Sequence, residues 1–338
     1  MSAGILISTR TLRSCLEDLR PLFGKGTNLI PVLFKVKDDT VTVCCTNGCI
    51  YVNKLPITND SRISSELTVQ YRNILDFLPA DGMLNLVIES FGLTITGDGT
   101  EITLPVGFSL ITEPERKDVT FEKIDAKTFP VGLTSLMNIG LSTIYKVDKP
   151  LNIYGNISTL KYPNVIAQAR TAGLPVNVSL TQDFTKLLCR FNPDAIYCNN
   201  IDSIVLKRGD AYLEIPAEPI RDENDFLQHM VDLSEPVRLD ATHYVDRLRN
   251  MNSLGNHVRA KITLFDNGVR VRAEESNVAI SYDLGDCSGK VNKVLYLPML
   301  LYLSMVKALG NNMIEFLYGK EIICLRSPSL IIIARAIV

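Results

Sequence analysis

The sequence is poor in the side chains that most often carry catalysis. It has only three histidines, His229, His243 and His257, and they are scattered. Neither an HExxH zinc motif nor a GxSxG nucleophile motif is present. The stretch GKGT at residues 24–27 resembles part of a phosphate-binding loop, but Leu19 stands where that loop requires glycine. We therefore expect no enzymatic activity and no cofactor.

The eight cysteines lack the spacing of a metal site. Cys44, Cys45 and Cys49 are close together, but no second CxxC or HxxxH half completes a zinc-binding pattern. Five others stand singly within apolar runs: Cys15, Cys189, Cys198, Cys287 and Cys324. We expect reduced, buried thiols that pack as small hydrophobic side chains, and no metal.

Long hydrophobic runs are also lacking. No stretch approaches 18 uninterrupted apolar residues, and the opening MSAGILISTR lacks the form of a signal peptide. With 338 residues, 46% of them hydrophobic, the chain is long enough for two or three domains. We expect a soluble, cytoplasmic protein. Its net charge of −2 means that a polyanionic partner would need a local basic surface.

What the sequence does contain is a layout that recurs along the chain. In the first third, apolar residues at helical spacing predict a helix over 9–26. Alternation on either side of Asp38-Asp39 predicts a hairpin and a further strand over 33–57. A second predicted helix, 70–80, ends at Pro79 and leads into another hairpin.

The last third repeats this order, and the middle third repeats it less regularly. Helices are predicted over 126–140, 181–191, 241–258 and 298–311, with strands over 151–170 and 260–284. Asp266-Asn267-Gly268 is a strong hairpin signal within the last range. Each third therefore predicts an α+β domain with two helices and about eight short strands, with boundaries at 1–116, 117–234 and 235–338. The predicted linkers, 112–118 and 218–236, are charged and contain proline.

Basic residues are concentrated in the six predicted helices. These helices hold eleven basic residues and five acidic ones, whereas the whole chain is slightly acidic. Helices that share one surface would make that surface basic. The basic residues are Arg10, Arg13, Arg20, Lys25, Arg72, Lys127, Lys186, Arg190, Arg247, Arg249 and Lys307.

The layout resembles the DNA polymerase sliding clamp of the bacterial, three-domain beta type. The resemblance is carried by the repeat and by PLFGKGTNLIPVLFKV (21–36), YRNILDFLP (71–79), LYLPMLLYLSMVKAL (295–309) and SLIIIARAIV (329–338). It implies three similar clamp domains, each with two helices packed on antiparallel sheets, that form half of a closed ring. The implied function is that of a homodimeric processivity factor, which encircles double-stranded DNA, is opened by a loader ATPase and tethers the replicative polymerase.

The same resemblance implies the sites on such a ring. The eleven basic residues would face DNA without reading its sequence. A pocket for linear peptides of the polymerase and the clamp loader would involve Val165, Ile166, Pro216, Ile332, Ile333, Ala334, Ala336 and Val338. The family usually has Met and Pro where Ala334, Arg335 and Ala336 stand, so the peptide preference would differ. A bacterial cell, or a bacterial host infected by a phage, is the implied location.

The resemblance also implies a subunit interface between the first domain of one chain and the third domain of the other. Strand 101–110 would pair with a strand of the neighbour and so cover an open sheet edge. The candidate interface residues are Phe108, Leu110, Met251 and Leu254. Two other interpretations stay open: a β-rich, triplicated structural or assembly protein without DNA binding, and a nucleic-acid enzyme with an unrecognised site.

Overall fold

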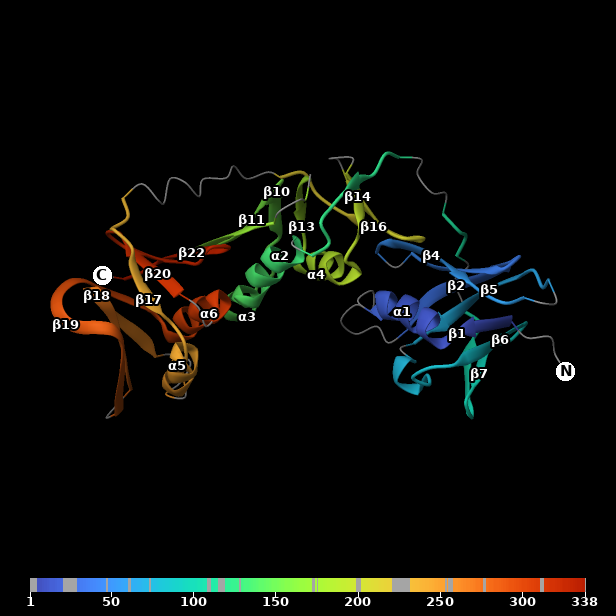
Figure 1. Cartoon of the computed structure of the whole chain (residues 1–338), viewed down its shortest axis with the longest axis horizontal. Helices are drawn as coiled ribbons and strands as arrows, with labels where there is room; N and C mark the ends of the chain where they lie inside the picture. Colours follow the sequence, from blue (N-terminus) through green and yellow to red (C-terminus); the bar gives the residue numbers. More distant parts are fainter. Residues whose placement is uncertain are drawn as a thin grey trace. The chain divides into compact units, whose positions relative to one another are not determined.

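The computed structural model shows antiparallel sheets covered by short helices (Figure 1). It describes residues 5–20, 29–46, 48–59, 62–72, 74–107, 111–114, 119–127, 129–171, 174, 176–198, 202–220, 232–252, 254, 258–275, 278–310 and 313–337. The chain divides into two compact units, Met1–Ala126 with Lys186–Glu218 and Lys127–Thr185 with Pro219–Val338. The α+β class predicted from the sequence is confirmed. The three-domain boundaries stay a prediction, and much of both predicted linkers lies outside the described residues.

The first unit, called unit 1, contains two sheets. Its strands are β1 (Ile5–Ser8), β2 (Ile30–Lys37), β3 (Thr40–Cys45), β4 (Ile50–Pro56), β5 (Ser65–Tyr71), β6 (Met83–Glu89), β7 (Gly92–Gly97), β8 (Thr100–Pro105), β9 (Glu122–Lys123), β14 (Ala195–Cys198), β15 (Ser203–Arg208) and β16 (Ala211–Pro216). One sheet has the order β1-β6-β7-β8, and the other has the order β5-β2-β3-β4-β16-β15-β14-β9. Helix α1 (Thr9–Leu19) and the 3-10 helix η2 (Leu75–Phe77) belong to this unit.

The second unit, called unit 2, contains an eight-stranded sheet and a long ribbon. Its strands are β10 (Leu151–Tyr154), β11 (Ile157–Tyr162), β12 (Val165–Arg170), β13 (Asn177–Leu180), β17 (Val237–Asp240), β18 (Arg259–Glu275), β19 (Val278–Pro298), β20 (Met313–Tyr318), β21 (Ile322–Arg326) and β22 (Leu330–Arg335). The sheet has the order β13-β10-β11-β12-β22-β21-β20-β17, and β18 pairs with β19. The helices are α2 (Phe129–Asn138), α3 (Leu141–Tyr145), α5 (Tyr244–Asn252) and α6 (Met299–Leu309), while α4 (Gln182–Phe191) runs from unit 2 into unit 1.

A similar element order recurs along the chain: a strand, a helical segment and then further strands, as in β1-α1-β2-β3-β4 and β13-α4-β14-β15-β16. The opening strand of each such segment pairs with the strands of its neighbouring segment. Thus β1 pairs with β6 while β5 pairs with β2, and β9 pairs with β14 while β13 pairs with β10. Because of this exchange, neither segment of such a pair completes its sheet alone.

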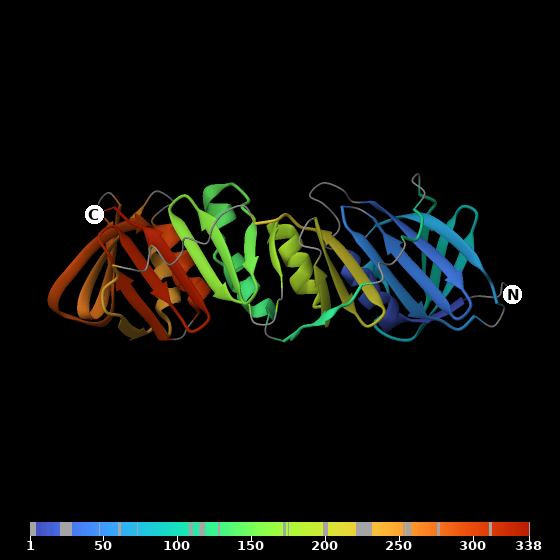
Figure 2. The same cartoon turned by 90° about the horizontal axis from the view of Figure 1, so that it is seen from above.

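Sheets of neighbouring segments also join edge to edge. In unit 1, β4 pairs with β16 through Val52 and Tyr212. In unit 2, β12 pairs with β22 through Val165 and Ala334, and Figure 2 shows the green strands beside the red ones. Each eight-stranded sheet therefore spans two of the predicted domains. In Figure 1, helices α2, α3 and α6 lie on one side of the sheet of unit 2.

The predicted helix over 70–80 is wrong. Residues up to Tyr71 belong to β5, where Tyr71 pairs with Ile30, and only the single turn η2 follows. The guanidinium of Arg13 donates hydrogen bonds to the carbonyl oxygens of Leu75 and Leu78, both at 2.9 Å. The pairing of Tyr71 with Ile30 and the hydrogen bonds from Arg13 therefore take the place of the expected helical hydrogen bonds.

The hairpin predicted at Asp266-Asn267-Gly268 is also wrong. Strand β18 continues through these residues and pairs with β19, with a change of register between Phe265 and Asn267. A side chain at Gly268 would come within 2.5 Å of the carbonyl oxygen of Asp286. This glycine therefore permits close approach of two strands, whereas the sequence pattern suggested a tight turn.

Candidate nucleic-acid interface

The residues predicted to face DNA lie on or beside the short helices, some in unit 1 and the others in unit 2. Apolar residues of α1 at helical spacing, Leu12, Cys15, Leu16 and Leu19, are buried against the sheets of unit 1. The opposite face of the helix is polar and includes exposed Arg10. The amphipathic pattern thus directs part of the basic charge of α1 to the surface.

Nine of the eleven predicted DNA-facing residues are exposed in the structure. These nine are Arg10, Arg20, Arg72, Lys127, Lys186, Arg190, Arg247, Arg249 and Lys307. Lys25 lies outside the described residues, and Arg13 is half-buried against η2. Arg72 and Lys127 are not within helices. Arg72 lies between β5 and η2, and Lys127 precedes α2. The fold therefore exposes most of these cations, and their role in DNA binding stays a prediction.

Arg10 and Arg249 form ion pairs with neighbouring carboxylates. Arg10 Nη2 lies 2.8 Å from Asp81 Oδ2, and Arg249 Nη1 lies 3.0 Å from Asp246 Oδ1. Both pairs are exposed to solvent, where such pairs contribute little to stability. Arg20, Arg72, Arg247 and Lys307 form no ion pair with any residue that the structure describes. These four side chains are the ones best placed to meet an external anion.

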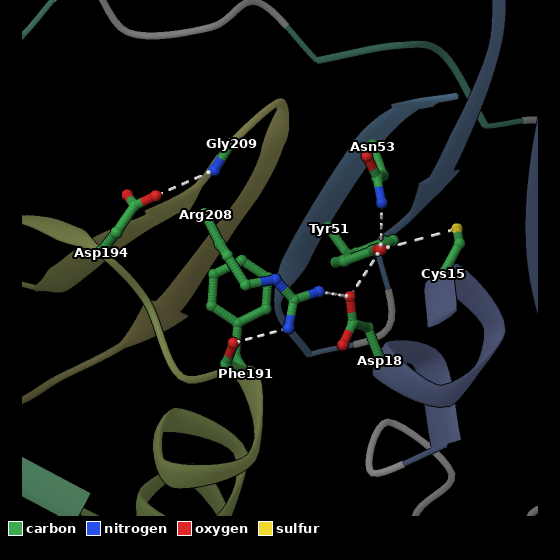
Figure 3. Close-up of polar contacts among 8 residues, drawn as sticks. All are labelled: Cys15, Asp18, Tyr51, Asn53, Phe191, Asp194, Arg208 and Gly209. Carbon is green, nitrogen blue, oxygen red and sulfur yellow. Dashed lines mark hydrogen bonds and ion pairs between the residues drawn. The ribbon is translucent and has the colours of Figure 1, made fainter. Parts of the chain in front are cut away.

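A buried polar network connects α1 to the part of unit 1 contributed by residues after 186 (Figure 3). Asp18 on α1 is 6% exposed, accepts a hydrogen bond from Tyr51 at 3.1 Å and forms an ion pair with Arg208 on β15. Asn53 Nδ2 donates to the Tyr51 hydroxyl at 3.0 Å. Arg208 also donates to the carbonyl oxygen of Phe191 at 2.8 Å, and its guanidinium lies 4.8 Å from the centre of that ring.

Burial raises the pKa of the Asp18 carboxyl, and the charge and hydrogen bond of Arg208 oppose this shift. A buried carboxylate is costly unless it is paired, so Arg208 and Tyr51 are needed to keep Asp18 satisfied. The network therefore fixes α1 and the end of α4 against the joint between β4 and β16. Its members are far apart in the sequence, and no local motif indicates them.

The other face of each eight-stranded sheet carries a second apolar cluster, and we call this face the outer face. In unit 1 the cluster contains Leu33, Cys44, Val52, Val205 and Tyr212. In unit 2 it contains Ile166, Leu317, Cys324 and Ile333. Both clusters cross the joint between the two halves of the sheet, and their apolar contacts support the edge-to-edge pairing.

The prediction of buried thiols is confirmed for five cysteines and wrong for three, because Cys189, Cys198 and Cys287 are only partly buried. Cys15, Cys44, Cys49 and Cys324 are buried, and burial raises the pKa of each thiol to about 12. These thiols are therefore protonated and unreactive at neutral pH. Within the described part of the chain, no group of three potential metal ligands is found.

The residues predicted to line a peptide pocket lie mainly along the joint between β12 and β22. Val165 pairs with Ala334, and Ile166 pairs with Ile333. Val165, Ile166, Ile332, Ile333, Ala334 and Ala336 are all buried within the chain. Pro216 is exposed and belongs to unit 1, and Val338 lies outside the described residues. The structure thus brings together six of these eight residues, whereas their role in binding stays a prediction.

The predicted subunit interface includes one open sheet edge. Strand β8 ends the order β1-β6-β7-β8, and just beyond its last residue Val106 forms a bridge with Val69 and the N–H of Gly107 donates to the carbonyl oxygen of Thr68 at 2.8 Å. Phe108 and Leu110 lie outside the described residues. Met251 is fully buried in the core of unit 2 and offers no surface to a partner, while Leu254 is half-exposed.

Comparison with known proteins decides the fold. The sequence matches no protein-family model, and it matches no curated protein. The structure, however, is similar over 99% of the chain to the beta subunit of DNA polymerase III from Pseudomonas aeruginosa, with a TM-score of 0.76 and 14% identity over 100% of that chain. The chain has the sliding-clamp fold.

Two further solved structures support this conclusion. The DNA polymerase sliding clamp from Caulobacter crescentus has a TM-score of 0.74 and 12% identity, with 100% of both chains covered. The DNA polymerase III beta subunit from Thermotoga maritima has a TM-score of 0.76 and 13% identity, with 99% of both chains covered. The low identity shows that the sliding-clamp fold is reached here with a strongly divergent sequence. Among the described helices, none is both long and apolar enough to cross a membrane.

Proposed function

We propose that this protein is a DNA sliding clamp, a processivity factor that encircles double-stranded DNA and tethers a replicative polymerase. The observation that carries the proposal is the recurring segment of a strand, a helical part and further strands, whose sheets join edge to edge at β4–β16 and β12–β22. A repeat that joins in this way can continue until it closes into a ring. The sliding-clamp fold over the whole chain supports the same conclusion.

The proposed ring contains two copies of this chain. Two joints are formed within one chain, and β8 of unit 1 with the first half of β19 of unit 2 are the edges proposed for a third joint. Both carry exposed apolar side chains, because Val106 follows β8 and is 38% exposed and Val278 begins β19 and is 52% exposed. Pairing of β8 with β19 of a second copy would cover these edges and give a homodimer.

DNA would pass along the helices without recognition of its base sequence. Arg20, Arg72, Arg247 and Lys307 are exposed and have no ion-pair partner among the described residues, so they can attract phosphates and release counterions. None of this requires contact with base edges, which a sliding protein must avoid. The acidic balance of the rest of the chain disfavours binding of DNA elsewhere.

Partner proteins would bind by a linear peptide near the joint between β12 and β22. Ile166 and Ile333 of the outer-face cluster, together with Ala336 and the chain end, are the proposed apolar contacts. The clamp loader would use this site to open the ring, and the polymerase would use it afterwards. The proposed protein performs no catalysis and needs no cofactor, since its contribution is topological. We propose that it acts in the cytoplasm of a bacterial cell or of an infected bacterial host.

Primer extension on a circular, singly primed template tests the function. With polymerase and clamp loader from the same source, addition of this protein should lengthen the product of each binding event. The effect should disappear when the loader is omitted, because a closed ring cannot thread onto a circle. An unchanged product length in the presence of all components would overturn the proposal.

A further inference from the structure

A cavity of about 700 Å³ opens on the outer face of the sheet of unit 2, at the end away from Val165. Its side chains come from strands that also contribute to the outer-face cluster. Arg170 is the last residue of β12, whereas Ile166 of the cluster lies near the start of that strand. The main-chain N–H of Arg170 donates to the carbonyl oxygen of Ser329 at 3.1 Å, which fixes this end of the strand.

Three arginines and one carboxylate give the cavity its charge. Glu315 lies between two of them: Arg238 Nε donates to Oε1 at 2.7 Å, and Arg326 Nε donates to Oε2. Burial would raise the pKa of Glu315, but the hydrogen bonds from Arg326 and Arg238 outweigh it and lower the pKa. Since each guanidinium has five N–H donors, both arginines keep donors for a ligand.

Arg170 adds a third positive charge at the rim. It is exposed and forms no ion pair with any residue among those that the structure describes. The cavity therefore has three cations against one anion, on a chain whose net charge is −2. Such a local excess of positive charge favours a ligand that carries carboxylates.

The same cavity has an apolar wall. Ile157 is 37% exposed and Met313 is 53% exposed, and Ile331 and Pro328 also contribute to the lining. An anion alone would leave this apolar surface in contact with water. A ligand that places an apolar side chain next to a carboxylate would use both features. A phosphodiester backbone has no side chain to place on this apolar wall, so a peptide fits the cavity better than DNA.

We propose that this cavity binds an acidic linear peptide of a partner protein, with carboxylates at Arg170, Arg238 and Arg326 and an apolar side chain between Ile157 and Met313. The site is separate from the pocket proposed at the joint near Val165 and Ala334. It goes beyond the proposed clamp function, because peptide capture here requires neither DNA nor a closed ring.

Methyl NMR of the full-length protein, labelled with ¹³C at its methionine methyl groups, tests the proposal directly. The probe is the peptide acetyl-Glu-Leu-Glu-Leu-amide, and its control is acetyl-Gln-Leu-Gln-Leu-amide. The acidic peptide should shift the Met313 methyl signal in a saturable manner, and the neutral peptide should bind much more weakly. Equal binding of the two peptides, or no shift at Met313, would overturn the proposal.

Variants separate the contribution of each charge. Arg170→Gln should weaken binding of the acidic peptide roughly tenfold, which is typical of losing one charge-assisted hydrogen bond. Glu315→Gln should strengthen binding, because Arg238 and Arg326 would then have no internal carboxylate. Arg62→Gln, which removes an exposed arginine of unit 1, should leave the affinity unchanged. Unchanged affinity in Arg170→Gln would contradict the proposed contact.

Two further measurements complete the test. Inorganic phosphate at the same concentration should not reproduce the Met313 shift; if it does, the cavity is a general anion site and the peptide proposal is wrong. Arg170→Gln should also keep the DNA retention of the unaltered protein. A loss of peptide binding with normal DNA retention supports the second site, whereas a failure of DNA retention in the unaltered protein would count against the clamp function alone.

Discussion

Asp18 on α1 and Arg208 on β15 form a buried ion pair although 190 residues separate them in the sequence. The pair lies on the same side of the sheet as α1 and connects the first predicted domain to the second within unit 1. Replacement of Asp18 by Asn should leave Arg208 without its carboxylate while keeping an acceptor for Tyr51. We expect a loss of about 2 kcal/mol in the free energy of unfolding, reduced from the value for a fully buried pair because Arg208 is partly exposed.

Chemical denaturation of the two proteins checks this expectation. Glu17→Gln is a matched control, because Glu17 precedes Asp18 on α1 and is exposed. It should change the free energy of unfolding by less than about 0.5 kcal/mol. If Asp18→Asn is as stable as the control, the network does not stabilise the joint.

Charge reversal at the exposed cations should weaken DNA binding. The variant Arg20→Glu, Arg72→Glu, Arg247→Glu and Lys307→Glu reverses four exposed cations that have no ion-pair partner among the described residues, and it introduces repulsion of phosphates. We expect weaker DNA binding and a smaller dependence of affinity on salt, as measured by fluorescence anisotropy over a range of salt concentrations. Arg13 is left intact, because its hydrogen bonds to η2 make it part of the fold.

A matched variant reverses four exposed lysines that lie on strands and turns: Lys37, Lys161, Lys290 and Lys320. It carries the same change in net charge. It should bind DNA better than the helix variant does. Equal loss in the two variants would show that net charge, and not the helix surface, governs the interaction.

The free edge of β19 should determine the oligomeric state. Val278→Lys with Ile280→Lys places two charges on the strand that we propose pairs with β8 of a second copy. We expect light scattering to show two chains for the unaltered protein and one chain for this variant, because edge charges oppose strand pairing. Val131→Lys, at an equally exposed apolar position on α2, should remain a dimer. A dimeric edge variant would place the interface elsewhere.

Stability should fall as the pH rises above about 9. Unfolded thiols lose their protons near their usual pKa of 9.0, whereas Cys15, Cys44, Cys49 and Cys324 hold theirs to about 12 in the folded chain. The folded state therefore binds more protons between these values, and each such thiol lowers the free energy of unfolding by about 1.4 kcal/mol per pH unit in this range.

Denaturation at a series of alkaline pH values measures this slope. Cys44→Ala with Cys324→Ala removes two of the four thiols, both from the outer-face clusters. The double variant should lose less stability per pH unit than the unaltered protein, even if it starts from a lower value. The same slope in both proteins would contradict the assignment of alkaline sensitivity to these thiols.

An element is predicted correctly from the sequence where its local apolar pattern agrees with its contacts in the folded chain. Leu12, Cys15, Leu16 and Leu19 repeat at helical spacing and are all buried, so α1 was predictable from periodicity alone. The apolar run at 70–80 has a similar pattern, but pairing of Tyr71 with Ile30 and the hydrogen bonds of Arg13 replace the helix. Long-range contacts of this kind leave no local signal.

The candidate sites, too, were only partly predictable from the sequence. The concentration of basic residues in helices was visible in the sequence, because amphipathic helices direct polar side chains outward. The ion pair of Asp18 with Arg208 and the cavity of Arg170, Arg238 and Arg326 were not predictable, because strands distant in sequence bring these residues together. At Gly268 the local pattern was misleading, because it is typical of a turn whereas the glycine permits close packing of two strands.

Retention on circular DNA tests the central claim most directly. The protein is loaded by clamp loader and ATP onto a nicked circular plasmid and then separated from free protein by gel filtration at high salt, where phosphate contacts are weak. A ring that encircles DNA should remain with the circle and be released when a restriction enzyme cuts it. Equal retention on circular and linear DNA, or no retention on either, would contradict the account.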